Sequence, residues 1–393
     1  MEKISDQGRL APWMGFTLFG ILMAAFLVFF TPLQLKYGIP GLVITELGFA
    51  AIAVIFCLIR RVNIREVFPV KKISARDFFG CIFLAAGGFM ISLILVAVTA
   101  TVFPWSSQEA EELSDMIYRT MSYPMIVLIV ALLPAVCEEA IHRGAILSNF
   151  RSLKHDWVIV LIMAVFFGIN HVSVLRFLST AFLGAILSYV VVKKNNILLS
   201  MMMHFMNNLV SVTIGYLSIR VLGASVENVD ISSALGVYAL LGFMSPVFIV
   251  IGMMLINRES HKKIRFLYAG ILSAILLISG IGMIIVNGTG NTILNSTIGY
   301  EVTEESMEDS TLGFDIVEET EAVVVVVLTN AEGDYNIRID GDTGSNIINA
   351  PVPQGAIRMI SYNVTFRPDH YTITVVPQEN AIGEKPNLQF TIK

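Results

Sequence analysis

Charged side chains are scarce in this chain. Asp, Glu, Lys and Arg make up only 15% of its 393 residues, whereas hydrophobic residues make up 55% and the mean hydropathy is +0.72. Soluble globular domains have about a quarter of their residues charged. The composition therefore excludes an ordinary soluble protein and predicts a polytopic α-helical membrane protein.

Cysteine is scarce as well. The three cysteines, Cys57, Cys81 and Cys137, all lie in apolar runs, so no disulfide framework is predicted. Clusters of Lys and Arg of the kind that contact nucleic acid are also missing, and no nucleic-acid partner is expected.

Long apolar runs are abundant instead. Nine of them approach or exceed the roughly 20 residues that an α-helix needs to cross a bilayer. They cover residues 11–30, 40–59, 78–103, 123–147, 157–175, 177–192, 197–219, 234–256 and 266–286. We expect about nine membrane-spanning helices. No small-residue cleavage site follows the first run, which predicts a retained helix.

The loops between these runs differ in charge, and loops rich in Lys and Arg are typical of the cytoplasmic side. One alternating set holds most of the bases: Lys3, Arg9, Arg60, Arg61, Arg65, Lys71, Lys72, Arg76, Arg151, Lys154, Lys193, Lys194, Arg258, Lys262, Lys263 and Arg265. The other set has few bases and includes the acidic run Glu109, Glu111, Glu112 and Asp115. We therefore expect a cell-membrane protein with a cytoplasmic N-terminus and, after nine crossings, an extracytoplasmic C-terminal region.

The charge balance changes near the C-terminus. Residues 287–393 contain 16 acidic and 5 basic residues, against 15 acidic and 21 basic before them, which predicts two environments. Turn-forming residues at 287–291 are followed by short β-branched or aromatic runs at 322–328, 335–340, 356–364, 371–376 and 388–392. We expect a soluble all-β, sandwich-like domain. Because it contains no catalytic motif, it is predicted to bind an extracytoplasmic partner or to act as a spacer.

Two adjacent carboxylates, a histidine and an arginine interrupt the fourth apolar run. Ionisable groups inside a membrane cost about 3 kcal/mol each and usually face a protein interior or a water-filled cavity. Glu139 and Arg143 are spaced i, i+4 with the acid first, which favours an ion pair. Glu138 points about 100° away and stays available for chemistry. A buried ion pair that only locks helix packing would give the same spacing.

Two further runs carry polar groups at comparable depth. Phe167 and His171 share one helix face in the fifth run, as His204 and Asn208 do in the seventh. At about 1.5 Å per residue, Glu138, His171 and His204 lie about 16, 22 and 12 Å from the cytoplasmic ends of their runs. These depths fall inside a hydrocarbon core about 30 Å thick. We therefore expect three helices to present these groups to one cavity.

Such a set of groups suits amide hydrolysis. A carboxylate and a histidine can hold and deprotonate a water molecule, while a second histidine and an amide can donate hydrogen bonds to the developing oxyanion. Taken singly, each of these intramembrane polar residues would be explained by a hydrogen bond that only joins two helices.

Together the three motifs resemble those of a known family. Glu138-Glu139-x-x-x-Arg143, Phe167-x-x-x-His171 and His204-x-x-x-Asn208 are similar, in that order, to the motifs of the CPBP family, the CAAX-protease and bacteriocin-processing group. The resemblance covers about residues 78–256. It implies an intramembrane endopeptidase related to the type 2 prenyl-protein CAAX endopeptidase, which removes the last three residues of prenylated proteins.

The resemblance also implies roles for individual residues. Glu138 and His171 would activate water, and His204 and Asn208 would stabilise the oxyanion. The supporting pair, Glu139 and Arg143, would orient the first glutamate. His142 stands where the family usually has an aromatic residue; its ring either tunes Glu138 or faces another helix, and we expect the second.

Metal dependence is open at this point. Family members are commonly described as metalloproteases, and zinc would take His171, His204 and Glu138 as ligands of suitable type. The chain lacks a His-Glu-x-x-His motif, and the asparagine suits an oxyanion hole better than a zinc shell. We therefore expect a glutamate-dependent mechanism with no cofactor, with zinc as the alternative.

The predicted organisation has four parts: residues 1–77 with the first two helices and a basic loop, 78–256 with the catalytic helical core, 257–296 with a basic loop, the ninth helix and a linker, and 297–393 with the β-domain. Three functions fit this plan. The favoured one is a peptidase in the bilayer that acts on a membrane-associated protein or peptide. A non-enzymatic immunity or scaffold protein of the same fold is second. A proton-coupled transporter is third: intramembrane acids and histidines also form proton relays, but the sequence shows no pair of interrupted helices of the kind that inverted repeats produce.

Overall fold

The computed structural model describes residues 10–103, 106, 117–118, 120–221, 231–258, 263–288, 294–299, 302–303, 310–329, 331–344, 346–352 and 358–392. The chain divides into two compact units, Met1–Gly215 with Asp230–Ile284, and Tyr216–Val229 with Ile285–Lys393. The expectations that rested on Lys3, Arg9, Lys262, the acidic run at 109–115 and the linker residues 289–291 lie outside the described residues.

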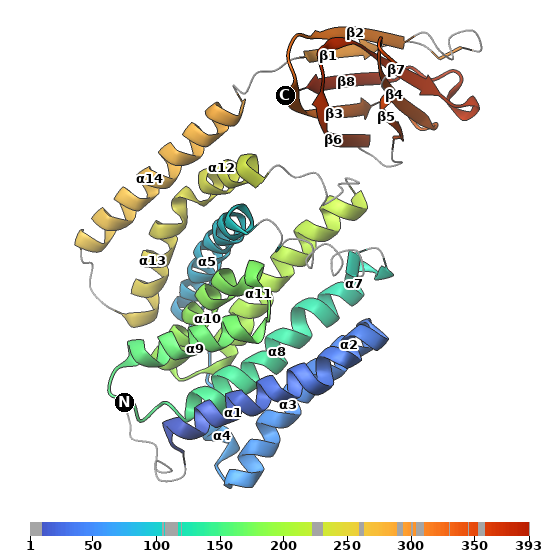
Figure 1. The fold of residues 1–393 in the computed structure, drawn as a ribbon. Helices are drawn as coiled ribbons and strands as arrows, with labels where there is room; N and C mark the ends of the chain where they lie inside the picture. The colour runs from blue at the N-terminus through green and yellow to red at the C-terminus, as the bar shows by residue number, and fades with distance from the viewer. Residues whose placement is uncertain are drawn as a thin grey trace. The chain divides into compact units, whose positions relative to one another are not determined.

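The first unit is built of helices (Figure 1). Its elements are α1 (Pro12–Ala25), η1 (Phe26–Phe30), α2 (Thr31–Tyr37), α3 (Ile39–Arg60), α4 (Ile64–Val67), α5 (Ala75–Val102), α7 (Tyr123–Ile126), η3 (Val127–Leu132), α8 (Leu133–Glu139), η4 (Ala140–Ile146), α9 (Asp156–Asn170), α10 (Val174–Lys194), α11 (Ile197–Tyr216), α12 (Ile231–Leu241), η7 (Gly242–Met244), α13 (Ser245–Asn257) and α14 (Lys263–Gly288). A π-helical turn, η5 (Leu217–Val221), follows α11. Within the unit, α5 packs against α10, α12 and α13, and α3 packs against α8 and η4.

Eight helices in the described part of the chain are long and apolar enough to cross a bilayer. They are Pro12–Tyr37, Ile39–Arg60, Ala75–Val102, Tyr123–Ile146, Val174–Lys194, Ile197–Tyr216, Leu235–Asn257 and Lys263–Ile285. The prediction of a polytopic α-helical membrane protein is confirmed: the chain is an integral membrane protein.

The fifth predicted run, 157–175, does not form one spanning helix. α9 has 15 residues, a length of about 22 Å, and ends at Asn170. The chain leaves the helix there because Val172 has a φ of 45°, a left-handed conformation that a β-branched residue adopts only at a break. α10 starts again at Val174. Instead of nine similar spans, the described residues form eight long apolar helices and one shorter apolar helix, α9.

The fourth span is irregular where its charged residues lie. α8 is flanked by two π-helical turns, η3 and η4. Pro134 lies at the start of α8, where the ring removes one backbone donor and disturbs the regular hydrogen-bond ladder. Wide turns of this kind are frequent at functional sites. They place Glu138 and Glu139 on a short regular turn between two irregular ones.

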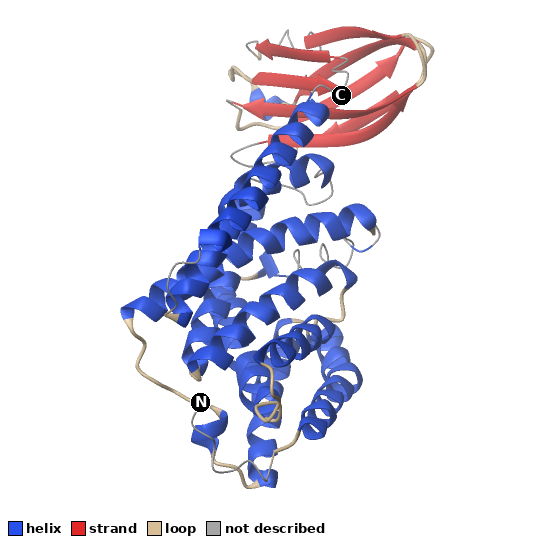
Figure 2. Ribbon diagram, turned by 90° about the vertical axis from the view of Figure 1, so that its left-hand side faces the viewer, coloured by secondary structure: helices blue, strands red, loops and turns tan. Residues whose placement is uncertain are grey.

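The second unit contains the strands, as the colouring in Figure 2 shows. They are β1 (Leu294–Gly299), β2 (Ser310–Ile316), β3 (Thr320–Thr329), β4 (Tyr335–Gly341), β5 (Asn346–Pro351), β6 (Arg358–Phe366), β7 (Asp369–Pro377) and β8 (Asn387–Ile392), with a short helical turn η8 (Glu379–Ala381). Two four-stranded sheets have the orders β1-β8-β3-β6 and β2-β7-β4-β5, and every pairing is antiparallel. The predicted all-β domain of two sheets is confirmed.

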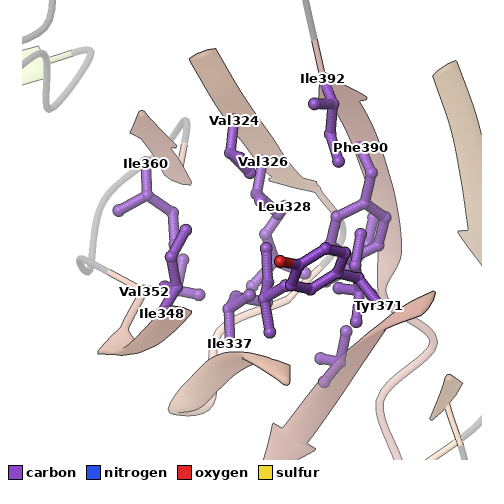
Figure 3. Close-up of a cluster of buried hydrophobic side chains, with 14 of the residues drawn as sticks. Val324, Val326, Leu328, Ile337, Ile348, Val352, Ile360, Tyr371, Phe390 and Ile392 are labelled. Atoms are coloured by element: carbon purple, nitrogen blue, oxygen red, sulfur yellow. The ribbon is translucent and has the colours of Figure 1, made fainter. Parts of the chain in front are cut away.

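The core of this unit follows from alternation along the strands. Val324, Val326 and Leu328 of β3 are at most 2% exposed and point to one side of their sheet, as the two-residue period of a strand requires. Phe390 and Tyr371 come from β8 and β7 into the same cluster (Figure 3). The core therefore lies between the two sheets.

Candidate active site

The ion pair expected from the i, i+4 spacing is present. Arg143 Nη1 donates to Glu139 Oε1 over 2.8 Å, and both side chains are completely buried. Arg143 Nη2 donates to the backbone carbonyl of Gly184 over 3.1 Å. Because Gly184 belongs to α10, the arginine connects the irregular fourth span to that helix.

His204 of α11 joins the same carboxylate. Its Nδ1 lies 3.0 Å from Glu139 Oε1, and its Nε2 lies 3.9 Å from Glu138 Oε2. A carboxylate can only accept, so the hydrogen of this bond is on Nδ1. The 3.9 Å separation is longer than a hydrogen bond. Nε2 thus faces Glu138 without bonding to it.

His171 lies at the C-terminal end of α9 and is oriented by its own helix. Its Nδ1 lies 2.8 Å from the Phe167 carbonyl oxygen. Since the carbonyl accepts, Nδ1 carries the hydrogen and Nε2 of the neutral ring is an acceptor. The spacing Phe167-x-x-x-His171 therefore fixes the tautomer that a proton-accepting histidine needs.

The ring of Phe167 holds these groups together. It is completely buried, and the Arg143 guanidinium carbon lies 4.3 Å from its centroid. The rings of His142, His171 and His204 pack edge-on around it at 5.2, 5.0 and 5.7 Å between centroids. One aromatic face thus receives the cation while its surroundings position three imidazoles.

His142 lies in this cluster and faces another helix, as expected. Its Nδ1 bonds to the Glu138 backbone carbonyl over 3.0 Å, and its ring meets Phe167 of α9 edge-on. The side chain of Glu138 is not its partner.

Asn208 is placed differently from the other predicted residues. It lies on α11 one turn after His204, and its Nδ2 reaches the Val130 carbonyl of η3 over 3.5 Å. Its Oδ1 accepts a hydrogen bond from Asn207 over 3.2 Å. Among the described contacts it has none to Glu138, Glu139 or His171. Since 3.5 Å is a long hydrogen bond, the amide is only loosely held by Val130.

Four polar atoms of the cluster are buried and have no hydrogen-bond partner in the described part of the chain. Three of them, Glu138 Oε2, Glu139 Oε2 and His142 Nε2, can accept a hydrogen bond, and the fourth, Arg143 Nε, can donate one. Buried polar atoms in native proteins nearly always have a partner, which is often ordered water. The cluster therefore offers acceptor positions to water or to a substrate.

The zinc alternative finds no ligand set in this geometry. Across the residues that the structure describes, no group of three or more His, Cys, Asp or Glu side chains is arranged to hold a metal ion. The Nδ1 atoms of His171 and His204 bond to protein oxygens. These bonds leave the Nε2 atom of each ring open, as in histidines that bind metals, so the donor types suit zinc although the described side chains do not converge on one point.

Sequence reasoning did not single out one buried acidic residue on a helix that packs against the site. Glu46 lies in the first half of α3 and is only 4% exposed, and α3 packs against α8 and η4. The signal for it is an acidic residue within the apolar run 40–59, the same kind of signal that drew attention to Glu138.

Gly184 permits the close packing of α10 on the cluster, and we expect Gly184→Ala to damage it. A Cβ at this position would lie 2.8 Å from Phe167 Cβ and 3.3 Å from Ala164 Cα. Such overpacking costs about 1–3 kcal/mol and moves the carbonyl that binds Arg143. We expect lower thermal stability of the purified protein and lower activity. Gly270→Ala is the matched control, because nothing lies within 4 Å of its Cβ position; equal stability of the two variants would contradict this explanation.

Comparisons with known proteins bear on this segment of the chain. A family model described as "Type II CAAX prenyl endopeptidase Rce1-like" matches residues 120–210, which include all seven residues of the three sequence motifs. The resemblance found in the sequence is thus confirmed, and it indicates a CAAX-type intramembrane protease. No curated protein matches the chain. Among solved structures, the pre-peptidase C-terminal domain of a collagenase from Bacillus anthracis matches at 16% identity, with a TM-score of 0.21, over 25% of this chain and 90% of that one.

Proposed function

We propose that this membrane protein, which carries an Rce1-like segment, is an intramembrane endopeptidase that hydrolyses a peptide bond of a membrane-associated protein or peptide. The observation that carries the proposal is the buried cluster itself. Three helices of the matched segment bring Arg143, His171 and His204 around the Phe167 ring. Arg143 and His204 both bond to Glu139, which lies beside Glu138 in an apolar helix long enough to cross a bilayer. If these side chains served only to pack the helices together, their buried oxygen atoms would be expected to have hydrogen-bond partners within the protein.

Glu138 and His171 are the groups proposed to activate water. Glu138 Oε2 has no partner among the described residues, and His171 presents Nε2 as an acceptor because its Nδ1 is bound to Phe167. A water molecule held by these acceptors loses a proton to Glu138 as its oxygen attacks the scissile carbonyl carbon. When the C–N bond then breaks, that proton passes from Glu138 to the leaving amine.

Oxyanion stabilisation is proposed for His204 and Asn208, and the geometry sets a condition on each. His204 gives its Nδ1 hydrogen to Glu139, so its Nε2 donates to an oxyanion only when the ring is an imidazolium. The carboxylate of Glu139 stabilises that cation. Asn208 must exchange its long bond to Val130 for one to the substrate oxygen. Both groups then donate where negative charge develops.

The proposal is tested with the purified full-length protein in detergent and in proteoliposomes. The probes are a farnesylated peptide that ends in a CAAX sequence, its unprenylated copy and single-span transmembrane peptides, and mass spectrometry maps the products. We expect cleavage of at least one membrane-anchored probe. A well-folded protein that cleaves none of them would favour the scaffold function instead.

We propose that the reaction is glutamate-dependent and needs no metal. We then expect clearly less than one metal ion per chain in active protein, with activity that survives prolonged treatment with a strong chelator. Elemental analysis and the peptide assay measure both. One tightly held zinc per chain, lost in His171→Ala and restored together with activity in the wild type, would reverse this assignment.

We propose a cytoplasmic N-terminus and an extracytoplasmic β-unit. Lys193 and Lys194 at the end of α10 and Arg258 at the end of α13 line one hollow of about 360 Å³, which supports placing the loops after these two helices on the same side of the membrane. Because loops rich in Lys and Arg are typical of the cytoplasmic side, we assign that side to both. An impermeant maleimide should label Val317→Cys on intact cells and Lys193→Cys only after lysis. Val317 is 89% exposed, while the native cysteines are buried and give little background. The reverse pattern would invert the topology.

A further inference from the structure

A hollow rich in basic side chains lies where α10 and α13 end. It has a volume of about 360 Å³ and is lined by Lys193, Lys194, Ile256, Asn257 and Arg258. Lys193 and Lys194 are in the last turn of α10, and Arg258 follows the last residue of α13. Sites for small molecules usually have volumes of about 300–1,000 Å³. This basic hollow is therefore large enough to hold a charged group together with the atoms bonded to it.

The bases of the hollow are only partly neutralised by carboxylates. Lys194 Nζ lies 2.5 Å from Asp77 Oδ1, and Lys193 Nζ lies 3.0 Å from Asp156 Oδ2. The third base, Arg258, is exposed and forms no hydrogen bond or ion pair through its side chain with another described residue. The hollow thus presents a guanidinium group that is available to an anion.

A fourth base lies beside the hollow and favours an anion there. Arg76 Nε and Nη2 donate to the backbone carbonyls of Leu255 and Met254 over 3.0 and 3.1 Å. These carbonyls belong to the last turn of α13, where the helix dipole places a partial negative charge that would repel an anion. Arg76 offsets that charge. With four bases and two acids, the surroundings of the hollow keep two positive charges in excess.

The position of the hollow in the fold is that of lipid headgroups. α10 and α13 form the ends of two apolar helices of spanning length, Val174–Lys194 and Leu235–Asn257. Asp77, the ion-pair partner of Lys194, lies near the start of a third, Ala75–Val102. Apolar helices end where the hydrocarbon core ends. The basic hollow is therefore at the level at which lipid phosphates lie.

Aromatic side chains next to the hollow agree with this level. Trp157 follows Asp156 in the chain and is 65% exposed, and Phe79, two residues after Asp77, is 54% exposed. Tryptophan is enriched at the boundary between a membrane and water. Exposed apolar rings beside a cluster of bases suit a ligand that has acyl chains as well as a negative charge.

We propose that the basic hollow binds the phosphate of an anionic phospholipid headgroup. Arg258 and Lys193 donate hydrogen bonds to the phosphate oxygens, while Lys194 stays paired with Asp77 and adds its charge. Basic pockets between membrane helices suit such headgroups. Free phosphate has the same charge but no acyl chains, so the depth of the hollow and the exposed rings favour the lipid. The inference does not depend on the proposed peptidase activity.

The test uses the purified full-length protein in a neutral detergent. Native mass spectrometry measures the affinity for phosphatidylglycerol and for phosphatidylcholine, and thermal unfolding is followed with each lipid and with inorganic phosphate. A ligand that binds only the folded state raises the unfolding temperature. We expect phosphatidylglycerol to bind and to raise it, with little effect of phosphatidylcholine or inorganic phosphate.

Variants locate the binding. Each Lys or Arg near an anionic lipid contributes about fivefold to the affinity, so Arg258→Asn combined with Lys193→Met should weaken phosphatidylglycerol binding about 25-fold. Asparagine suits position 258, where φ is 56°, because it tolerates the left-handed conformation. Arg258→Lys keeps the charge and should bind nearly as well as the wild type.

Arg61→Asn is the matched control. Arg61 also ends a spanning helix with a positive φ, 51°, but it does not line the hollow, so the affinity should stay within about twofold of the wild type. Unfolding temperatures without lipid check that each variant is folded, and Arg258→Asn alone, expected to bind about fivefold more weakly, decides the question if the double variant is unstable.

Four results would overturn the proposal. They are equal binding of phosphatidylglycerol and phosphatidylcholine, an unchanged affinity in the folded Arg258→Asn variants, an equal loss in Arg61→Asn, and stabilisation by inorganic phosphate as large as that by phosphatidylglycerol. The last result would assign the hollow to free phosphate instead.

Discussion

Glu138→Gln is expected to abolish peptide hydrolysis in a protein that stays folded and inserted. The change keeps the size of the side chain and removes only its ability to accept a proton. General-base catalysis contributes about 10²- to 10⁴-fold in rate, so residual turnover should be at or below the limit of detection. The folded state should tolerate the change because the nearest ionic partner of Glu138, His204 Nε2, is 3.9 Å away.

The measurement is turnover of the best probe peptide alongside thermal unfolding and membrane extraction. Comparison of the peptides released by cells that carry the wild type or Glu138→Gln would in addition identify natural substrates. Glu138→Gln with normal turnover would show that the base is assigned to the wrong residue.

Glu139→Gln is expected to act through stability as well as rate. Glu139 Oε1 accepts from both Arg143 and His204, and the amide that replaces it leaves the arginine buried without its counterion. Breaking a buried ion pair by removing one partner costs about 3–5 kcal/mol. We expect a clear fall in thermal stability and, because His204 loses its acceptor, a fall in kcat.

The control for this variant is a more exposed ion pair. Lys193 and Asp156 are 3.0 Å apart, with 38% and 35% of their side-chain surfaces exposed, and such a pair contributes about 0–1 kcal/mol. Lys193→Met should therefore be nearly as stable as the wild type. If Glu139→Gln were equally stable, the buried pair would not be the support of the cluster.

Local spacing explains why much of the site was predictable from sequence. The Glu139–Arg143 pair and the Phe167–His171 bond are both i, i+4 contacts within one helix, and helical geometry alone brings such residues together. Membrane burial added a second constraint, because every ionisable residue in an apolar run needed an explanation. The three motifs could therefore be recognised from local spacing and from their position inside apolar runs.

Contacts between helices were not predictable in the same way. The estimated depths in the membrane put His204 and Glu138 at similar levels. Spacing along the chain does not say which residue of another helix His204 contacts, and in the structure its Nδ1 atom bonds to Glu139. The role of the Phe167 ring as the common contact of three histidines depends on the rotation of α9 about its axis. The burial of Glu46 likewise depends on which face of α3 packs against α8.

Two errors in the predicted elements have local causes. The run 157–175 is apolar throughout, so hydropathy did not register the turn at Val172, where φ is 45°. In the β-unit, β1, β2 and β5 were missed because their sequences, Leu294–Gly299, Ser310–Ile316 and Asn346–Pro351, are rich in Asn, Ser, Gly and Thr. They are strands because each pairs with a neighbour over its length.

The short α9 has a consequence for the lipids around the protein. One of its faces is exposed and apolar at every fourth residue, at Trp157, Leu161, Val165 and Ile169, so acyl chains cover it. Its length of about 22 Å is less than an ordinary hydrocarbon thickness of about 30 Å, so one end of α9 stops short of the membrane surface unless the bilayer thins around it. We therefore expect acyl-chain length to control how near the aqueous phase comes to His171, just beyond the end of α9.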